Sequence, residues 1–228
     1  MNTWRSAKAF VRSAFPGGVD AYRRARAALA ARRRRDLRAI FTDIYLHNGW
    51  EDAESVSGRG STLARTAVVR RELPRLLAEL GARSLLDAPC GDFNWMRHVA
   101  LPGVAYVGAD VVAELVERNR RAYGGGGRRF VALDLTRDPL PRADLILCRD
   151  CLIHLSLPDA LRALDNFRRS GARHLLATTH TSVGENADVE TGGWRPLDLQ
   201  LPPFDLPAPA RLLVEDAAQG KCLGLWRL

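Results

Sequence analysis

The fold is decided by the stretch Ser84-Leu85-Leu86-Asp87-Ala88-Pro89-Cys90-Gly91-Asp92. Its first four residues form a short apolar run that ends in an acid, and a turn containing Pro89 and Gly91 comes next. Such a run between turn residues predicts a buried β-strand of an α/β sheet. In open α/β sheets a ligand binds beyond the carboxyl ends of the strands, and a glycine there lets it approach the backbone. The stretch therefore predicts a strand over 84–87 and one edge of a binding site.

Further apolar runs downstream alternate with amphipathic segments. Apolar residues at helical spacing predict helices over 111–123 and 158–170. Alternation of strands and helices is typical of a parallel sheet with crossover helices. The last two runs are joined by a short turn and predict a closing hairpin. The predicted strands after the first one are 105–110, 129–134, 144–148, 174–179, 211–215 and 222–227.

The first 61 residues differ from the rest of the chain. Residues 1–38 carry eleven Lys and Arg and two acids, whereas the remainder carries 23 basic and 24 acidic residues. Apolar spacing predicts helices over 19–46 and 62–80, joined by a Gly- and Ser-rich loop. We therefore expect a basic N-terminal helical extension and loop, 1–61, before an α/β domain, 62–228. The Arg run 32–35 is interpreted as a solvated helical face, with a membrane-surface or polyanion contact as the alternative.

Acidic residues close three consecutive predicted strands. Asp87, Asp110 and Asp134 each stand at the carboxyl end of a strand and so at the same edge of the sheet. Asp110 comes after Asp87 at about the spacing at which an acid binds ribose hydroxyls in dinucleotide folds. A carboxylate can accept two hydrogen bonds from a cis-diol, and Asp134 could accept one from an adenine amine. Three acids at one edge are a stronger indication of a site than any one of them.

These motifs, together with the segment 144–154, resemble the ordered motifs of class I S-adenosylmethionine-dependent methyltransferases. The region 41–61, followed by the Pro-Cys-Gly-Asp-Phe turn at 89–93, resembles a bacterial subgroup of these enzymes. The resemblance implies a Rossmann-like, seven-stranded, mostly parallel sheet with a C-terminal antiparallel hairpin, and S-adenosylmethionine as cofactor. It places Asp87 and Gly91 near the methionine, Asp110 on the ribose and Asp134 near the adenine. Ala88-Pro89-Cys90 departs from the family's glycine-rich loop. The expected cofactor-binding residues are Ser57, Gly58, Asp87, Pro89, Gly91, Asp110, Val111, Asp134, Leu135 and Arg149.

The exit of the fourth predicted strand carries two candidates for acid–base chemistry. Methyl transfer to a hydroxyl requires alignment of the acceptor and removal of its proton. His154 has a suitable ordinary pKa, and Asp150 could serve instead or orient the acceptor. His154 could equally cap or pack the next helix. His180 comes after the fifth predicted strand and is a third catalytic candidate at the same edge.

Loops supply the candidate acceptor-binding residues. Asn186, Trp194 and Arg195 lie in the long polar stretch after the fifth predicted strand. Trp194 could stack on a sugar or aromatic ring, or simply pack a lid, and Arg195 could hold a carboxylate or phosphate. The stretch 55–61 could cradle the cofactor carboxylate with backbone amides, or cap the next helix.

The four cysteines do not indicate a disulfide framework or a metal site. Cys148 and Cys151 form a single close pair, and no second close pair exists in the sequence. We therefore expect reduced thiols in a cytoplasmic protein and no metal. No apolar run is long enough for a transmembrane helix, and no secretory signal is expected.

The leading functional expectation is an enzyme that O-methylates a hydroxyl of a small molecule or a sugar or glycan. The near-neutral domain favours a neutral acceptor, and nucleic acid is not expected as a partner. The alternatives are an RNA methyltransferase that uses the basic arm as a phosphate grip, and a non-catalytic cofactor-binding protein. An NAD-dependent enzyme is disfavoured because the first turn lacks the dinucleotide glycine pattern. The oligomeric state is left open.

Overall fold

The computed structural model describes residues 36–228. The Arg run 32–35 and most of the predicted helix 19–46 lie outside the described residues. From Leu37 to Leu228 the chain forms one compact unit. Residues 37–61, expected from the sequence as part of the extension, belong to the same unit as the sheet.

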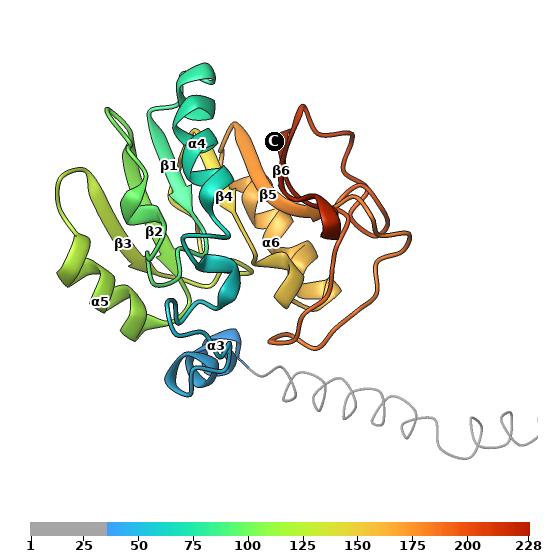
Figure 1. Ribbon diagram of the computed structural model, residues 1–228, viewed down its shortest axis with the longest axis horizontal. Helices are drawn as coiled ribbons and strands as arrows, with labels where there is room; N and C mark the ends of the chain where they lie inside the picture. Colours follow the sequence, from blue (N-terminus) through green and yellow to red (C-terminus); the bar gives the residue numbers. More distant parts are fainter. Residues whose placement is uncertain (1–35) are drawn as a thin grey trace, which may run out of the picture. The chain divides into compact units, whose positions relative to one another are not determined.

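A seven-stranded sheet with the order β3-β2-β1-β4-β5-β7-β6 forms the centre of this unit (Figure 1). The first five strands in this order pair in parallel, while β7 pairs antiparallel with both β5 and β6. The predicted sheet and its C-terminal hairpin are confirmed. The strands are β1 Ser84–Asp87, β2 Ala105–Asp110, β3 Arg128–Ala132, β4 Leu145–Cys148, β5 His174–His180, β6 Arg211–Asp216 and β7 Lys221–Arg227.

Helices cover both faces of the sheet. Alternate residues of β1 face opposite sides: Leu85 packs in the core under α4, and Leu86 packs in the core under α6. This alternation results from the two-residue period of a strand, and both positions are apolar because both faces are covered. The helices are α3 Leu37–Leu46, α4 Ala67–Glu79, α5 Ala113–Tyr123 and α6 Leu157–Arg169.

Helix α3 differs from the other three helices. None of its residues is fully buried, and in Figure 1 it lies beyond the edge of the sheet, apart from the helices on the two faces. Its apolar residues Leu37 and Phe41 are partly buried against the core. A Cβ at Gly192 would lie only 2.8 Å from Ile40, so the helix also packs closely on the loop after β5.

The predicted element boundaries shift by a few residues. Helix α4 begins at Ala67 instead of residue 62, because the hydroxyl of Thr62 bonds the Arg59 carbonyl in a short 3-10 turn. Strand β3 ends at Ala132, so Asp134 lies in the next turn and not at a strand end.

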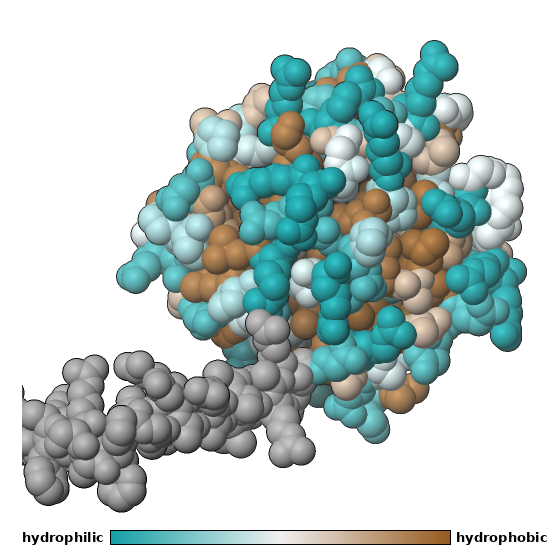
Figure 2. All heavy atoms as spheres, turned by 180° about the vertical axis from the view of Figure 1, so that it is seen from behind, coloured by the Kyte–Doolittle hydropathy of each residue, from teal (hydrophilic) through white to brown (hydrophobic). Residues whose placement is uncertain are grey.

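Hydrophilic and hydrophobic side chains lie side by side on the face of the molecule in Figure 2. Between residues 36 and 228, no helix combines the length and the apolar content needed to cross a bilayer.

Candidate active site

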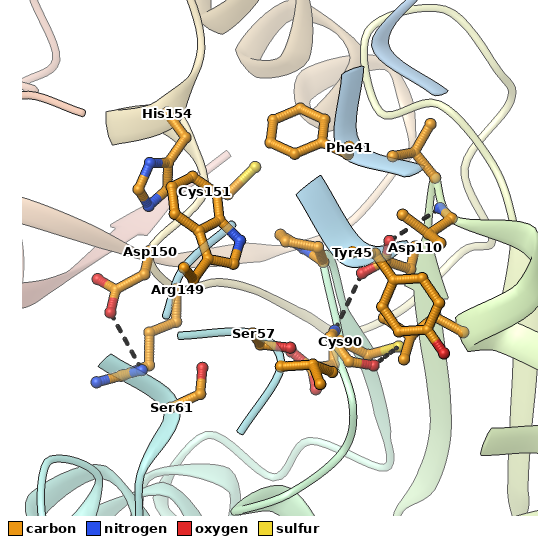
Figure 3. A pocket seen from close by; sticks show the side chains of 18 of the residues that line it. Phe41, Tyr45, Ser57, Ser61, Cys90, Asp110, Arg149, Asp150, Cys151 and His154 are labelled. Carbon is orange, nitrogen blue, oxygen red and sulfur yellow. Dashed lines mark hydrogen bonds and ion pairs between the residues drawn. The ribbon is translucent and has the colours of Figure 1, made fainter. Parts of the chain in front are cut away.

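The first cavity opens beyond the carboxyl ends of β1, β2 and β4, where the strand order reverses. It encloses about 1040 Å³ of empty space, part of it open to solvent. Figure 3 shows Asp110 on one side of it and His154 with Asp150 on the other. It is lined by Leu37, Phe41, Tyr45, Trp50, Val56, Ser57, Ser61, Asp87, Pro89, Cys90, Gly91, Trp95, Asp110, Val111, Val112, Leu115, Leu135, Arg149, Asp150, Cys151, His154 and Leu155.

Asp110 ends β2 and is held by backbone groups. Its Oδ1 accepts the Val112 N–H at 3.0 Å and its Oδ2 accepts the Gly91 N–H at 3.1 Å. Burial raises the pKa of this carboxyl although the backbone N–H groups act in the opposite direction. Each carboxylate oxygen keeps a lone pair for a ligand, so the geometry suits a pair of hydroxyls.

The Gly91 turn is fastened to the loop at residues 55–58. Gly91 has a φ of 53°, and a Cβ there would collide with the Ser57 hydroxyl, so both backbone conformation and space require glycine. Ser57 Oγ accepts the Asp92 N–H at 2.9 Å. The Asp92 carboxylate in turn accepts from the Val56 N–H and the Ser55 hydroxyl.

This arrangement corrects the expected role of Ser57 and Gly58. The Ser57 N–H donates to Ser55 Oγ, and the Gly58 N–H donates to the Ser55 carbonyl. The amides of residues 55–58 therefore bind Asp52, Asp92 and Ser55, and these four amides are not free to cradle a cofactor carboxylate. Ser57 still lines the first cavity, whereas Gly58 does not.

Asp87 lies at the end of β1 and is buried. Its Oδ2 accepts the Tyr106 hydroxyl at 2.6 Å. Burial raises the pKa of Asp87 to about 7, with the nearby Asp110 adding to the effect and the Tyr106 hydrogen bond opposing it. A cationic group next to Asp87 would be favoured, because it would compensate this buried charge.

Arg149 comes directly after β4, and its side chain is nearly sealed from solvent, 3% exposed. Its Nε donates to Glu215 Oε1 at 2.8 Å, and its Nη1 lies 3.2 Å from Asp150 Oδ2. The guanidinium also lies over the Trp95 ring, 5.6 Å from the centroid. Its Nη2 is buried and has no hydrogen-bond partner among the described residues. An unpaired buried donor beside a cavity is suited to an anionic ligand group.

Asp150 lines the first cavity and forms an ion pair with Lys221. Its φ is 48°, and this backbone conformation is held by the Asp150 N–H, which donates to Thr178 Oγ1 at 2.8 Å. Lys221 Nζ lies 2.6 Å from its Oδ2. Burial alone would raise the pKa of Asp150, but Arg149 and Lys221 outweigh it and lower the pKa to about 2. A carboxylate this strongly stabilised in its ionised form is a poor proton acceptor.

His154 is the last residue of the short turn after β4, and one of its ring nitrogens forms a hydrogen bond. Its Nδ1 lies 2.7 Å from the Gly193 carbonyl, so Nδ1 carries the proton and the lone pair is on Nε2. Burial lowers the pKa of His154 below its usual range, which keeps the ring neutral at pH 7. Its ring packs on Trp50.

A second cavity adjoins the first and shares Trp50, Ser57, Asp150 and His154 with it. It encloses about 1220 Å³ of empty space, part of it open to solvent. His180 and Trp194, both expected at the site, border this cavity, and Trp194 is 55% exposed. The other lining residues are Gly58, Arg59, Gly60, Arg65, Ile153, Glu215, Asp216, Gln219 and Lys221.

Asp134, Asn186 and Arg195 border neither cavity in the described chain. Asp134 closes a turn, because its carboxylate accepts from both the N–H and the hydroxyl of Thr136. Asn186 donates to backbone carbonyls of the loop after β5, and Arg195 donates to the Leu152 and Ala187 carbonyls. Buried irregular backbone needs such partners. These side chains therefore hold loops in place.

Sequence patterns did not reveal the contribution of α3 and of the C-terminal hairpin. Phe41 and Tyr45 line the first cavity, and Glu215 and Lys221 supply the partners of Arg149 and Asp150. The sequence did offer one sign that Lys221 is special, because it is the only lysine after residue 8. The apolar spacing of α3 can also be seen in the sequence, but such spacing does not predict which part of the protein the helix packs against.

The four cysteines are free and buried. In the part of the chain that the structure describes, no group of His, Cys, Asp and Glu side chains is arranged to hold a metal ion.

No protein-family model matches the sequence, and no curated protein matches it. The structure, however, is similar to solved methyltransferases. The 1,6-didemethyltoxoflavin-N1-methyltransferase of Burkholderia thailandensis, solved with S-adenosylhomocysteine, is 20% identical at a TM-score of 0.56, over 84% of this chain and 86% of that one. The N-methyltransferase NodS of Bradyrhizobium japonicum was also solved with S-adenosylhomocysteine. It is 17% identical at a TM-score of 0.57, over 80% of this chain and 97% of that one.

Human N-acetylserotonin methyltransferase, solved with S-adenosylmethionine, is 15% identical at a TM-score of 0.58. The match covers 82% of this chain but only 58% of the human one. These similarities confirm the predicted Rossmann-like methyltransferase fold.

Proposed function

We propose that this protein is an S-adenosylmethionine-dependent methyltransferase that methylates a hydroxyl group of a small molecule or a glycan. One observation carries the proposal: two cavities meet at His154, and the first lies at the reversal of strand order with Asp110 at the end of β2. Cofactor and acceptor must occupy adjoining spaces in a direct transfer. The methyltransferases with which the chain shares its fold were solved with S-adenosylhomocysteine or S-adenosylmethionine bound, which supports the choice of cofactor.

The residues of the first cavity fit this cofactor. Asp110 would accept the two ribose hydroxyls, since each of its oxygens keeps a free lone pair. The unpaired Nη2 of Arg149 would hold the carboxylate of the methionine part, and Asp87 its ammonium group. Phe41 and Tyr45 of α3 supply an apolar cover for the nucleoside.

The cofactor supplies a methyl group on a sulfonium, which is reactive toward an aligned oxygen. The protein therefore has to align the acceptor and remove its proton. His154 is suited to that role, because Nε2 bears the lone pair and the ring is neutral at pH 7. Asp150 is less suited, because its charge is paired with Lys221 and Arg149. We assign Asp150 to placing the acceptor and His154 to taking its proton.

The test is turnover with S-adenosylmethionine and acceptors that differ in the atom methylated. The purified protein would be incubated with sugars, phenols and primary amines, and S-adenosylhomocysteine formation measured for each class. We expect formation only with hydroxyl acceptors. Formation only with amines would contradict the O-methylation part, and none with any acceptor, despite cofactor binding, would favour a non-catalytic protein.

A further inference from the structure

Two histidines border the second cavity and reach it from different elements. His180 is the last residue of β5, and His154 ends the short turn after β4. Both are largely buried, and both have a backbone partner at Nδ1. The role inferred for this pair rests on the proposed function and concerns the acceptor that the second cavity takes.

The two backbone partners have opposite polarity. Nδ1 of His154 donates to the Gly193 carbonyl at 2.7 Å, which leaves the lone pair on Nε2. Nδ1 of His180 accepts the Leu197 N–H at 3.3 Å, which leaves the proton on Nε2. In a neutral imidazole one nitrogen donates and the other accepts, so the backbone selects a different tautomer for each ring. Neither Nε2 has a hydrogen bond to any residue of the described chain.

A single segment sets both tautomers. Gly193 and Leu197 lie four residues apart on either side of Trp194, and Arg195 fastens this segment. The Arg195 N–H donates to the Ile153 carbonyl, and its guanidinium donates to the Leu152 and Ala187 carbonyls. The segment that carries the exposed Trp194 ring therefore also sets the tautomers of His154 and His180.

Burial, rather than the neighbouring charges, keeps both rings neutral. Burial lowers the pKa of both histidines. Asp150 and Lys221 face both rings and are paired with each other, so their effects oppose. Arg195 also acts on His154, and Asp198 acts on His180. Both rings border the second cavity, and in their neutral forms His154 carries a lone pair on Nε2 and His180 carries a proton on Nε2.

We propose that the second cavity binds a vicinal diol, with His154 facing the hydroxyl that is methylated and His180 donating to the oxygen on the neighbouring carbon. The acceptor's O–H bond breaks and its proton goes to His154 Nε2. The oxygen forms a bond to the methyl carbon as the carbon–sulfur bond of the sulfonium breaks, and the sulfur retains that electron pair. One acceptor and one donor bordering the same cavity match an O–H and the lone pair of a neighbouring oxygen.

Two sources share this chemistry, a sugar ring and a catechol, and both have a flat face for Trp194. The probes are methyl α-D-mannopyranoside and cis-1,2-cyclohexanediol for the first source, and catechol for the second. Cyclohexanol and phenol are the matched compounds with one hydroxyl. The rate of S-adenosylhomocysteine formation is measured with each at saturating S-adenosylmethionine.

We expect at least one diol to react at least about tenfold faster than its single-hydroxyl counterpart, and the reacting diol identifies the source. In His180→Phe that preference should shrink about five- to tenfold, mainly through KM, because one neutral hydrogen bond is lost. His180→Gln, which retains an N–H donor, should recover part of it, and the exposed His47→Phe should leave it intact.

Calorimetric binding of S-adenosylhomocysteine is measured on every variant, which shows that each one has folded. Equal rates with diols and single hydroxyls, or no transfer to any diol by protein that binds S-adenosylhomocysteine, would overturn the diol proposal. Absence of S-adenosylhomocysteine binding by the wild type would instead overturn the proposed function.

Discussion

Trp50 and His154 pack ring against ring, with centroids 4.5 Å apart and planes inclined by 46°. The two residues border both cavities, although 104 positions separate them in the sequence. Trp50 comes from the loop after α3, and His154 from the turn after β4. Their contact brings the N-terminal part of the described chain against the centre of the sheet, at the point where the two cavities meet.

Replacing His154 with Ala should lower kcat by about a hundredfold or more, because proton removal by a positioned side chain contributes at least that much. Affinity for S-adenosylhomocysteine should change little. In the wild type, kcat should fall only as the pH drops below 6.5, since burial lowers the pKa of His154 and protonation removes the lone pair. Steady-state kinetics from pH 5 to 8 would measure both effects.

The exposed His47 provides the matched control, because His47→Ala removes a histidine 74% exposed and outside both cavities. Normal turnover by the His154 variant would show that this side chain only packs against Trp50.

Replacing Asp110 with Asn should weaken binding of S-adenosylhomocysteine by about 1.5–3 kcal/mol, the contribution of a hydrogen bond to a charged group. Isothermal titration calorimetry measures this directly. Asp165→Asn is the control, because Asp165 is exposed on α6 and, among residues 36–228, forms an ion pair with Arg168 alone. Equal affinity in wild type and Asp110→Asn would remove Asp110 from the ribose site.

Asp87 should make cofactor affinity depend on pH. Its pKa of about 7 in the free protein means that it is mostly protonated at pH 6. An ammonium group bound beside it would lower that pKa, so binding must release a proton below pH 7, and affinity rises with pH. We expect about a tenfold gain between pH 6 and pH 8, because the ionised fraction changes by that factor.

In Asp87→Asn this pH dependence should disappear, while the weaker affinity that remains is flat over the same range. The same calorimetric titrations at several pH values decide between the two outcomes. A wild-type affinity that is constant from pH 6 to 8 would show that no cationic group sits beside Asp87.

Glu215→Ala should destabilise the protein by about 3–5 kcal/mol, because it leaves the sealed guanidinium of Arg149 without its main partner. Glu79→Gln breaks the exposed pair with Arg211 and should cost under about 1 kcal/mol. Urea unfolding of both variants measures the difference. Similar small losses in the two would mean that water reaches the Arg149–Glu215 pair.

The sheet could be predicted from sequence because its strands are short apolar runs bounded by turn residues. All seven strands form where the pattern indicates them. The error at Asp134 has a local cause. Asp and Thr next to a strand end favour turns that bond their own backbone, and Asp134 bonds Thr136 in this way. Its carboxylate is thereby used in the turn.

The site could be predicted best at positions adjacent to strand ends. Asp87, Asp110, Arg149 and Asp150 each end or follow a strand, and all line the first cavity. Lys221 and Glu215 join them through the antiparallel pairing of the hairpin, which no local pattern reveals. Arg195 was assigned to the acceptor because polar loops often bind ligands. Here that side chain donates instead to the Ala187 carbonyl of the same loop and to the Leu152 carbonyl in the turn after β4.

The central claim is that the first cavity binds S-adenosylmethionine, and calorimetric titration of the wild-type protein with S-adenosylhomocysteine tests it most directly. NAD serves as the control ligand, since it also binds at the strand ends of α/β sheets. We predict a dissociation constant in the micromolar range for S-adenosylhomocysteine, about −8 kcal/mol, and no measurable heat with NAD. Binding of NAD alone, or of neither ligand, would contradict the account.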